Sequence, residues 1–187
     1  VILCEARVLR VTISSPKFII HRWCIHNFEI PVGLAGASAQ LLATDCAEFA
    51  HDGRAQSAMI LGDFNFVVEG EFRHSIASPA PQAWHMGPRA GADFSVLGVA
   101  LRSYRELAQP IDTHFSAAGA TSARIDRIYT SASAWQCSLL SISVEVGDPV
   151  ALDEAGISDH APLTVSLVAA PSTRSRRSIP SFVTKHS

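Results

Sequence analysis

The chain has 187 residues, of which 48% are apolar and 17% charged, enough for one globular domain with a sizeable core. No stretch approaches the roughly 20 apolar residues of a membrane span, and the start resembles no signal peptide, so we expect no membrane partner. Four of the 15 basic residues lie in residues 171–187, which contain no acid, so the rest carries 11 basic against 17 acidic residues and lacks a broad basic surface for nucleic acid.

The first two segments predict strands. Residues 7–14, RVLRVTIS, alternate so that Leu9, Val11 and Ile13 share one face, which predicts a half-buried strand with that apolar face inside. Residues 18–28 are β-branched and aromatic, which predicts a second strand.

The middle of the chain predicts two helices around a strand. Residues 36–53 carry an apolar stripe at helical spacing and end in glycine, which predicts a helix. The run MILGDFN, residues 59–65, predicts a buried strand that ends in a turn. Residues 73–92 are rich in proline and glycine and predict a loop, and residues 92–110 predict a second helix that ends at a proline.

Short strands are predicted for the remainder, at residues 113–116, 123–131, 137–146 and 161–169. Residues 171–187 have the Ser, Arg and Pro composition of a tail or linker, so residues 1–170 would form the domain. Strands with interposed helices predict an α/β layered domain with mixed strand directions.

Asp63 and Asn65 stand at the end of the strand predicted within residues 59–65. Side chains at i and i+2 share a face of an extended chain, so a carboxylate and a carboxamide would point together from the end of a sheet. Asp, Asn and Gly are also common turn formers, and a plain turn is the alternative interpretation.

Asp126 interrupts an apolar strand in ARIDRIYTS, with Arg124 on the same face. A charge inside such a strand is costly unless it is paired or bound to a metal, and a surface ion pair is the alternative. Asp159 and His160 come directly before a strand in GISDHAPL, where the carboxylate can orient the imidazole, although Asp-His beside proline is also ordinary in loops. His26, followed by Asn27, ends another strand, where a lone histidine is more often structural than catalytic.

The order of these motifs, His-Asn, LGDFN, RIDRIY and SDHAPL, resembles the endonuclease/exonuclease/phosphatase superfamily over roughly residues 5–168. That superfamily includes deoxyribonuclease I, abasic-site endonucleases, inositol polyphosphate phosphatases and the endonuclease domain of non-LTR retrotransposons. The resemblance implies a four-layer αββα sandwich of the deoxyribonuclease I type, of which this chain would be the C-terminal part.

The resemblance also implies an active site that uses Mg²⁺, or Mn²⁺, to cleave phosphodiester or phosphomonoester bonds. For an endonuclease of the retroelement type, the substrate would be DNA. Asp63 would orient the attacking water, and Asn65 would hold the phosphate and the nucleophile. Asp126 would order the site, and Asp159 would belong to the metal and histidine network. His160 would contact the scissile phosphate. His26 falls where some members have a phosphate-contacting histidine, and the metal ligands would be Asp159, Asp63 and Asn65.

Members of the superfamily also carry an Asn and a metal-binding Glu on strands upstream of the His-Asn strand. Only 25 residues precede His26 here, and Glu5 lacks the expected context, so we expect a chain that lacks its N-terminal strands and shows little or no Mg²⁺-dependent cleavage. A phosphatase for inositol phosphates or lipids, and a catalytically dead relic, are the competing interpretations. The basic tail would suit a linker to a further domain, with a frayed terminus as the alternative.

Four scattered cysteines without a Cys-x-x-Cys pair indicate reduced thiols, so we expect an intracellular protein, nuclear or cytoplasmic. The sequence predicts no oligomeric state. It does predict that the side chains named above converge at one end of a sheet, with His26 facing them and its neighbours Trp23 and Ile25 turned into apolar packing.

Overall fold

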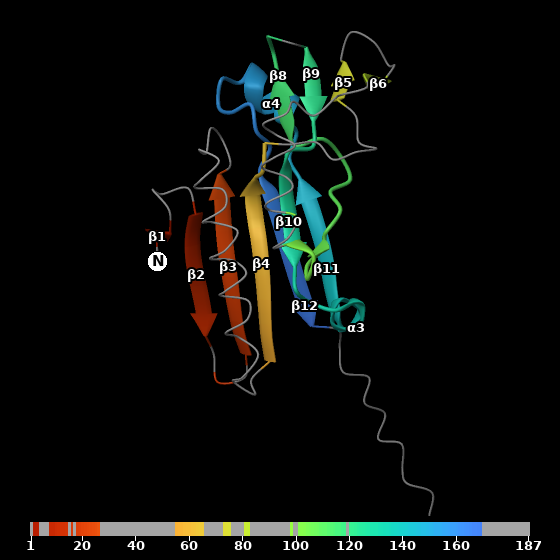
Figure 1. Ribbon diagram of the computed structural model, residues 1–187. Coiled ribbons are helices and arrows are strands. Elements are labelled where there is room, and N and C mark those ends of the chain that lie inside the picture. The colour runs from red at the N-terminus through yellow and green to blue at the C-terminus, as the bar shows by residue number, and fades with distance from the viewer. Residues whose placement is uncertain are drawn as a thin grey trace, which may run out of the picture.

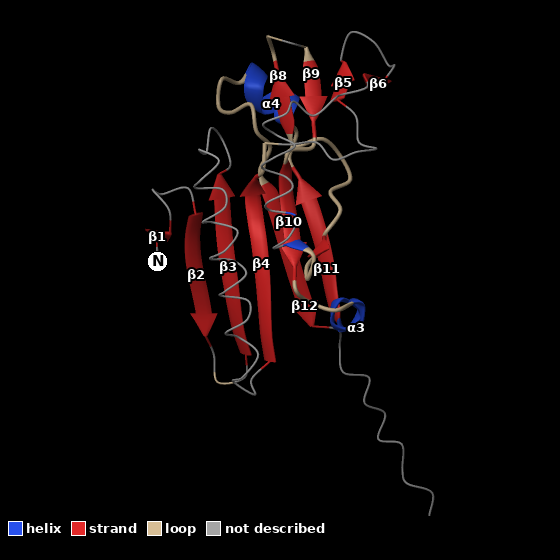
Figure 2. Ribbon diagram, viewed as in Figure 1, coloured by secondary structure: helices blue, strands red, loops and turns tan. Residues whose placement is uncertain are grey.

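A computed structural model describes residues 2–3, 8–14, 16, 18–26, 55–65, 73–75, 81–82, 98, 101–118 and 120–169. The described residues are mostly strands, which form three sheets (Figures 1 and 2). No helix in this part of the chain is long and apolar enough to cross a membrane.

The largest sheet has six strands and carries most of the core. In spatial order they are β1 (Ile2–Leu3), β2 (Val8–Ser14), β3 (Phe18–His26), β4 (Ala55–Asp63), β10 (Asp126–Thr130) and β7 (Arg105–Glu106). β3 and β4 pair in parallel, and the other neighbours are antiparallel. The carboxyl ends of β3 and β4 therefore meet at the edge of the sheet where β10 begins, which is the upper edge in Figure 1.

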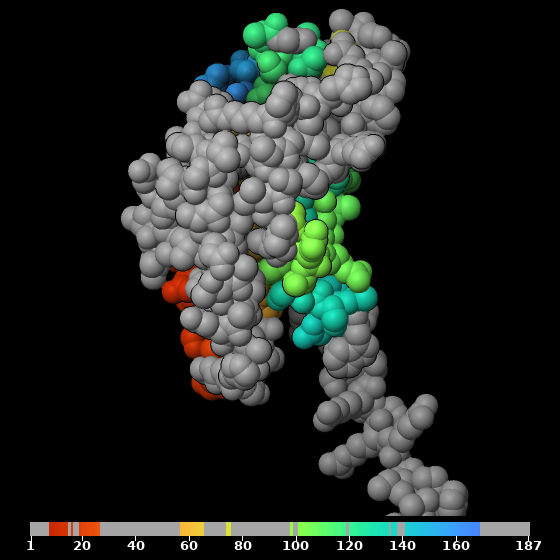
Figure 3. All heavy atoms as spheres, in the orientation of Figure 1, coloured from red at the N-terminus to blue at the C-terminus, as the bar shows by residue number. Residues whose placement is uncertain are grey.

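Two smaller sheets complete the described part. One has the order β6 (Pro81–Gln82), β5 (Arg73–Ser75), β9 (Thr121–Ala123) and β8 (His114–Ser116), and the other pairs β11 (Leu140–Val146) with β12 (Leu163–Ala169). The helices α3 (Ala134–Leu139) and α4 (Pro149–Glu154) have six residues each. Figure 3 shows the segment that carries β7 and the helix α3 exposed on the same face of the molecule.

Buried residues lie on both faces of the large sheet, since Trp23 pairs with Ile60 whereas Ile128 pairs with Leu61, the next residue of β4. Trp23 and Ile60 are register partners on β3 and β4, and both are 0% exposed. Ile25 and Ile128, on β3 and β10, are buried as well. These β-branched and aromatic residues fit a pleated, closely packed surface, and each buries an amount of apolar area that contributes about 1.5–3 kcal/mol.

The expected α/β four-layer sandwich is wrong for this chain. The described residues form strands in several sheets, with the short helices α3 and α4 and the helical residues Gly98 and Leu101 among them. The helix predicted at residues 92–110 is confirmed at Gly98 and Leu101, but its later part gives way to β7, whose residues Arg105 and Glu106 pair with Thr130 and Tyr129 of β10. Such long-range pairing outweighs the modest helix propensity of the segment. The helix predicted at residues 36–53 lies outside the described residues, as does the tail at residues 171–187.

The strands predicted near β3, β4, β8, β10 and β12 are confirmed, and two other segments differ. The region predicted as a loop at residues 73–92 contains β5 and β6, and the strand predicted at residues 137–146 begins only at Leu140, after α3. Both differences come from segments whose partners are distant in sequence, since β5 pairs with β9 and β11 pairs with β12.

The strand predicted at residues 7–14 is confirmed as β2 (Val8–Ser14), but the apolar face expected to be inside is exposed, and the buried residue of β2, Val8, lies on the other face. Leu9, Val11 and Ile13 are 40–42% exposed, whereas Val8 is 2% exposed. The reason is the register with β3, which places Val8 opposite the buried Ile25. Residues opposite each other across two strands point to the same side of a sheet, so the face with Val8 follows the core face of β3.

Candidate functional site

Three strand ends place polar side chains next to one another at one edge of the large sheet. Asp63 ends β4, and its register partners are His26, the last residue of β3, and Asp126, the first residue of β10. Since neighbouring strands lie about 4.8 Å apart, Asp63 is flanked on both sides within contact range. His26 Nε2 lies 3.8 Å from Asp63 Oδ2.

His26 lies on the more open side of this group. Its side chain is 57% exposed, whereas that of Asp63 is 11% exposed. Trp23 and Ile25 of the same strand are buried, as expected from the sequence. Asn27 lies outside the described residues.

The chain passes from β4 into the site through a glycine. Gly62 has φ +142°, and a Cβ at this position would collide with the backbone carbonyl of Ile25. Only glycine tolerates both conditions, so Gly62 lets β4 approach β3 closely one residue before Asp63.

Asp63 and Asn65 come together through a turn and not through strand alternation. Asn65 has φ 55°, in the left-handed region that asparagine tolerates better than most residues. Its backbone N–H donates to Asp63 Oδ1 at 2.8 Å, and its side-chain Nδ2 donates to Asp63 Oδ2 at 3.4 Å. This Asx-type turn fixes both carboxylate oxygens of Asp63. The two interpretations of the sequence, a turn and a functional site, therefore apply to the same residues.

Phe64 anchors the turn between these two residues. It is 0% exposed, its backbone N–H donates to the carbonyl of Ile125 at 3.0 Å, and its ring meets that of Tyr129 edge-on with 5.3 Å between centroids. The buried ring of Phe64 therefore fixes the turn against the core, between the two polar residues Asp63 and Asn65.

Asp126 holds the imidazole of His160. The distances from His160 Nδ1 to Asp126 Oδ2 and Oδ1 are 3.0 and 3.2 Å. The backbone N–H of Asp126 donates to Thr113 Oγ1 at 2.9 Å, and Thr113 is 0% exposed. Arg124, which the sequence placed on the same face as Asp126, instead pairs with Glu106 at 3.3 Å.

The pKa values of His160 and Asp63 are both raised above their ordinary values. The hydrogen bond that His160 donates to Asp126 raises the pKa of His160, partial burial opposes this, and the negative charges of Asp126, Asp63 and Asp159 add to the rise. Burial raises the pKa of Asp63, the charge of Asp126 raises it further, and the hydrogen bond from Asn65 and the charges of His160 and His26 oppose the rise. The site therefore favours a protonated imidazole beside a carboxylate that is costly to ionise.

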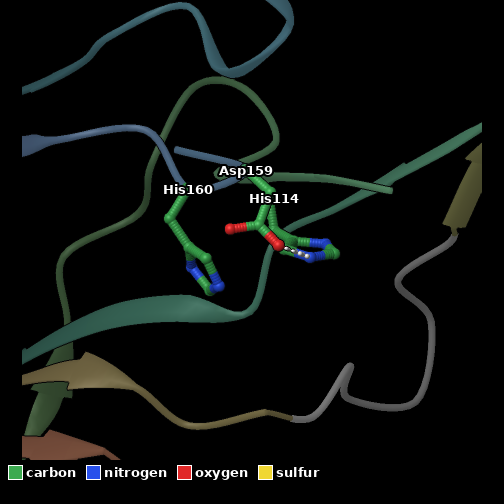
Figure 4. A group of neighbouring side chains, drawn as sticks. All are labelled: His114, Asp159 and His160. Carbon is green, nitrogen blue, oxygen red and sulfur yellow. Dashed lines mark ion pairs between the residues drawn. The ribbon is translucent and has the colours of Figure 1, made fainter. Parts of the chain in front are cut away.

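Asp159 lies in a second group, on the far side of His160. Its Oδ2 is 3.6 Å from Nε2 of His114, and the rings of His114 and His160 are 4.8 Å apart between centroids. One ligand atom from each of His114, Asp159 and His160 lies within 4.8 Å of the others. In Figure 4 the Asp159 carboxylate lies between the two imidazole rings.

His114 is the member of the site that sequence reasoning missed. It lies in β8 within DTHFS, between the buried Thr113 and Phe115. A polar side chain flanked by two buried residues was the available signal, but its partners, Asp159 and His160, are distant in sequence.

The structure thus brings the predicted residues together in two linked groups. Asp63, Asn65, Asp126, His160 and His26 are connected by the contacts above. Of the predicted metal ligands, Asp63 and Asn65 contact each other, whereas Asp159 pairs with His114.

No model of a known protein family matches this chain, and a search of curated proteins found no match. The function of the site is therefore inferred from its geometry and from the order of the sequence motifs. An Asp126–His160 pair lies beside Asp63, and His160 also belongs to the group with His114 and Asp159.

Proposed function

We propose that this chain carries the site of a metal-dependent phosphodiester hydrolase, of the retroelement endonuclease type, with DNA as substrate. The observation that supports this most directly is the Asp126–His160 pair placed beside Asp63 at adjacent strand ends. An oriented imidazole next to a carboxylate can serve hydrolysis at phosphorus, and the order of the sequence motifs points to the same chemistry.

His160 is the proposed contact to the phosphate. Its Nδ1 is held by Asp126, which leaves Nε2 for the substrate. Because its pKa is raised, more of the imidazole is protonated near neutral pH than in a free histidine. A protonated Nε2 can donate to a phosphate oxygen and stabilise the charge that develops there during in-line displacement.

Asp63 is the proposed group that orients the attacking water. Its raised pKa makes it a stronger base than an ordinary carboxylate, as a proton acceptor working near neutral pH requires. Asn65 fixes the orientation of Asp63 from one side. His26, which is exposed beside Asp63, is placed to meet the phosphate of an approaching strand.

The residues present fit a hard divalent cation. Asp63 and Asp126 are partly buried carboxylates on paired strand ends, and the charge of Asp126 adds to burial in raising the pKa of Asp63. Oxygen ligands from Asp63 and the side-chain carbonyl of Asn65 suit Mg²⁺ or Mn²⁺, whereas Asp159, the further ligand expected from the sequence, pairs with His114. Such an ion supplies charge stabilisation at the phosphate oxygens and offsets the acidic charge of the domain toward DNA.

The test is a plasmid-nicking assay on the purified chain at high protein excess and long incubation, with Mg²⁺, with Mn²⁺ and with chelator. We expect slow nicking that chelator abolishes. His160→Ala should lower the rate by about 10²–10⁴-fold, the usual contribution of one acid–base group. His74→Ala is the matched control, because His74 forms a His–Asp pair with Asp112 at 2.7 Å in a different sheet.

Two outcomes would count against the proposal. If the chain hydrolyses a phosphomonoester such as p-nitrophenyl phosphate faster than a phosphodiester, the phosphatase is favoured. Metal-dependent nicking that is absent, or that is equal in the wild type and His160→Ala, would favour a relic without catalysis.

A further inference from the structure

We propose that His114, Asp159 and His160 form a binding site for a transition-metal dication of the zinc class, distinct from the Mg²⁺ ligands of the proposed hydrolase. The group contains two imidazoles and one carboxylate, with one ligand atom of each within 4.8 Å of the others. Imidazole ligands select zinc, cobalt, nickel and copper over magnesium, which prefers oxygen.

The distances are close to those of a tetrahedral site. Ligand bonds of about 2.0–2.2 Å place neighbouring ligand atoms roughly 3.3–3.6 Å apart. His114 Nε2 and Asp159 Oδ2 are already 3.6 Å apart. His160, which is 32% exposed, closes the site with a shift of roughly 1 Å, and water takes the fourth position.

His160 has the orientation that a metal ligand needs. Its Nδ1 faces Asp126 at 3.0 Å, so the neutral ring donates its Nδ1 proton to that carboxylate and offers Nε2 to the ion. A carboxylate behind a ligating histidine is the common outer-shell arrangement of zinc sites, and it fixes both the tautomer and the ring direction.

The backbone also holds the two ligand-bearing segments side by side. His114 and His160 form an isolated antiparallel bridge. The N–H of Phe115 donates to the carbonyl of Asp159 at 2.8 Å, and the N–H of Ala161 donates to the carbonyl of Thr113 at 2.7 Å. Figure 4 shows the three side chains extending from these segments toward one another. Most of the ordering needed for metal binding is therefore already present in the fold.

Occupancy has a consequence for the proposed hydrolase, and this part of the inference rests on that proposal. Nε2 of His160 is the atom assigned to the phosphate, and an ion bound there removes it from the substrate. A zinc-class ion therefore inhibits the cleavage of DNA by this chain, whereas Mg²⁺ supports it.

The binding test uses Co²⁺ as a probe on the full 187-residue chain, because tetrahedral Co²⁺ absorbs in the visible range. The wild type should bind one equivalent with a tetrahedral spectrum, and Zn²⁺ but not Mg²⁺ should displace it. His114→Gln should weaken this binding at least tenfold, equal to about 1.4 kcal/mol. His74→Gln, which alters a His–Asp pair that has no third ligand among the described residues, should bind as the wild type does.

Because the chain has eight histidines and four cysteines, the assignment depends on these variants and on a second measurement. Histidine NMR of the wild type should show Zn²⁺ shifting the ring signals of His114 and His160 but not of His74. Circular dichroism establishes that His114→Gln is folded. The proposal is overturned if Co²⁺ shows no tetrahedral spectrum, if folded His114→Gln binds like the wild type, or if Zn²⁺ leaves both ring signals in place.

The nicking assay separates the two proposals. Zn²⁺ should inhibit Mg²⁺-dependent nicking by the wild type, and His114→Gln should need at least ten times more Zn²⁺ for the same inhibition. If the chain does not nick DNA at all, the hydrolase proposal fails while the Co²⁺ titration still decides the metal site. If it nicks and equal Zn²⁺ inhibits both proteins, the inhibitory role of this site is wrong.

Discussion

Thr113→Val tests whether one buried hydroxyl holds the site together. Thr113 is 0% exposed, and its Oγ1 accepts the backbone N–H groups of Ile125 at 3.2 Å and Asp126 at 2.9 Å. Valine has nearly the same shape, so the substitution removes the acceptor without leaving a cavity. It is therefore a change in hydrogen bonding and not in packing.

The magnitude follows from the two N–H groups that lose their acceptor. A buried donor left unsatisfied costs about 1–3 kcal/mol, so two cost roughly 2–6 kcal/mol. A domain of this kind is stable by about 5–15 kcal/mol, so the loss is a large share of the total. The backbone of Asp126 is also released, which weakens its hold on His160, and the pKa of His160 should fall toward its ordinary value.

Urea unfolding at fixed pH measures the free energy of unfolding, and a histidine NMR titration follows the pKa of His160. Thr130→Val is the matched control, because Thr130 is 2% exposed on the same strand as Asp126 and its Oγ1 accepts one backbone N–H, that of Ala132 at 3.1 Å. It should cost about 1–3 kcal/mol and leave the pKa of His160 unchanged. Thr113→Ser keeps the hydroxyl and should retain the raised pKa.

The reasoning is refuted if Thr113→Val costs no more than Thr130→Val. It is equally refuted if the pKa of His160 is the same in Thr113→Val and in the wild type, since Asp126 would then be held by other contacts.

Three further predictions concern neighbouring residues. Asp63→Asn should raise the free energy of unfolding near pH 7, because a carboxyl group with a raised pKa destabilises the fold as pH rises through that pKa. In urea titrations the gain should shrink toward about pH 3, and an equal gain at the two pH values would contradict the prediction. Asp126→Asn should lower the pKa of His160, whose contribution to stability is complete below about pH 6.5 and is lost as pH rises through its folded pKa. The variant should therefore lose more free energy of unfolding, relative to the wild type, at about pH 5 than at about pH 9. A difference that does not change with pH would argue against the prediction. Phe64→Ala should cost about 3–5 kcal/mol because the ring is fully buried, as thermal unfolding can measure, and a cost below that of Phe64→Leu would be inconsistent with this burial.

The strand ends were predictable from the sequence because their signals are local. The apolar run before Gly62 and the polar residues after it predicted where β4 ends, and it ends at Asp63. The same reasoning placed Asp159 and His160 directly before the strand that proved to be β12. Motifs that follow apolar runs predict side chains at a sheet edge without knowledge of the strand order.

The face of a strand and the positions of short strands were not predictable in this way. Alternation showed that Leu9 and Val11 share a face of β2, but only the register with β3 decides that Val8 and not Leu9 is buried. The two residues of β7, Arg105 and Glu106, lie in a segment with helical spacing. Their strand depends on pairing with β10, and Glu106 also forms a 2.8 Å ion pair with the buried Arg127 of that strand. No short stretch of the sequence contains both β7 and β10, so local patterns could not predict their pairing.

His114 escaped prediction for the same reason, and Thr113 explains how it reaches the site. The side chain of Thr113 holds the backbone of Asp126, and its carbonyl accepts the N–H of Ala161, the residue after His160. Both partners of the Asp126–His160 pair are therefore fixed to a single buried residue, and the residue after it is His114, the first of β8. Any shift of this strand moves the proposed catalytic pair and the proposed zinc-class site together. Substitution of Thr113 should therefore weaken both, whereas substitution of His114 removes a ligand from only one.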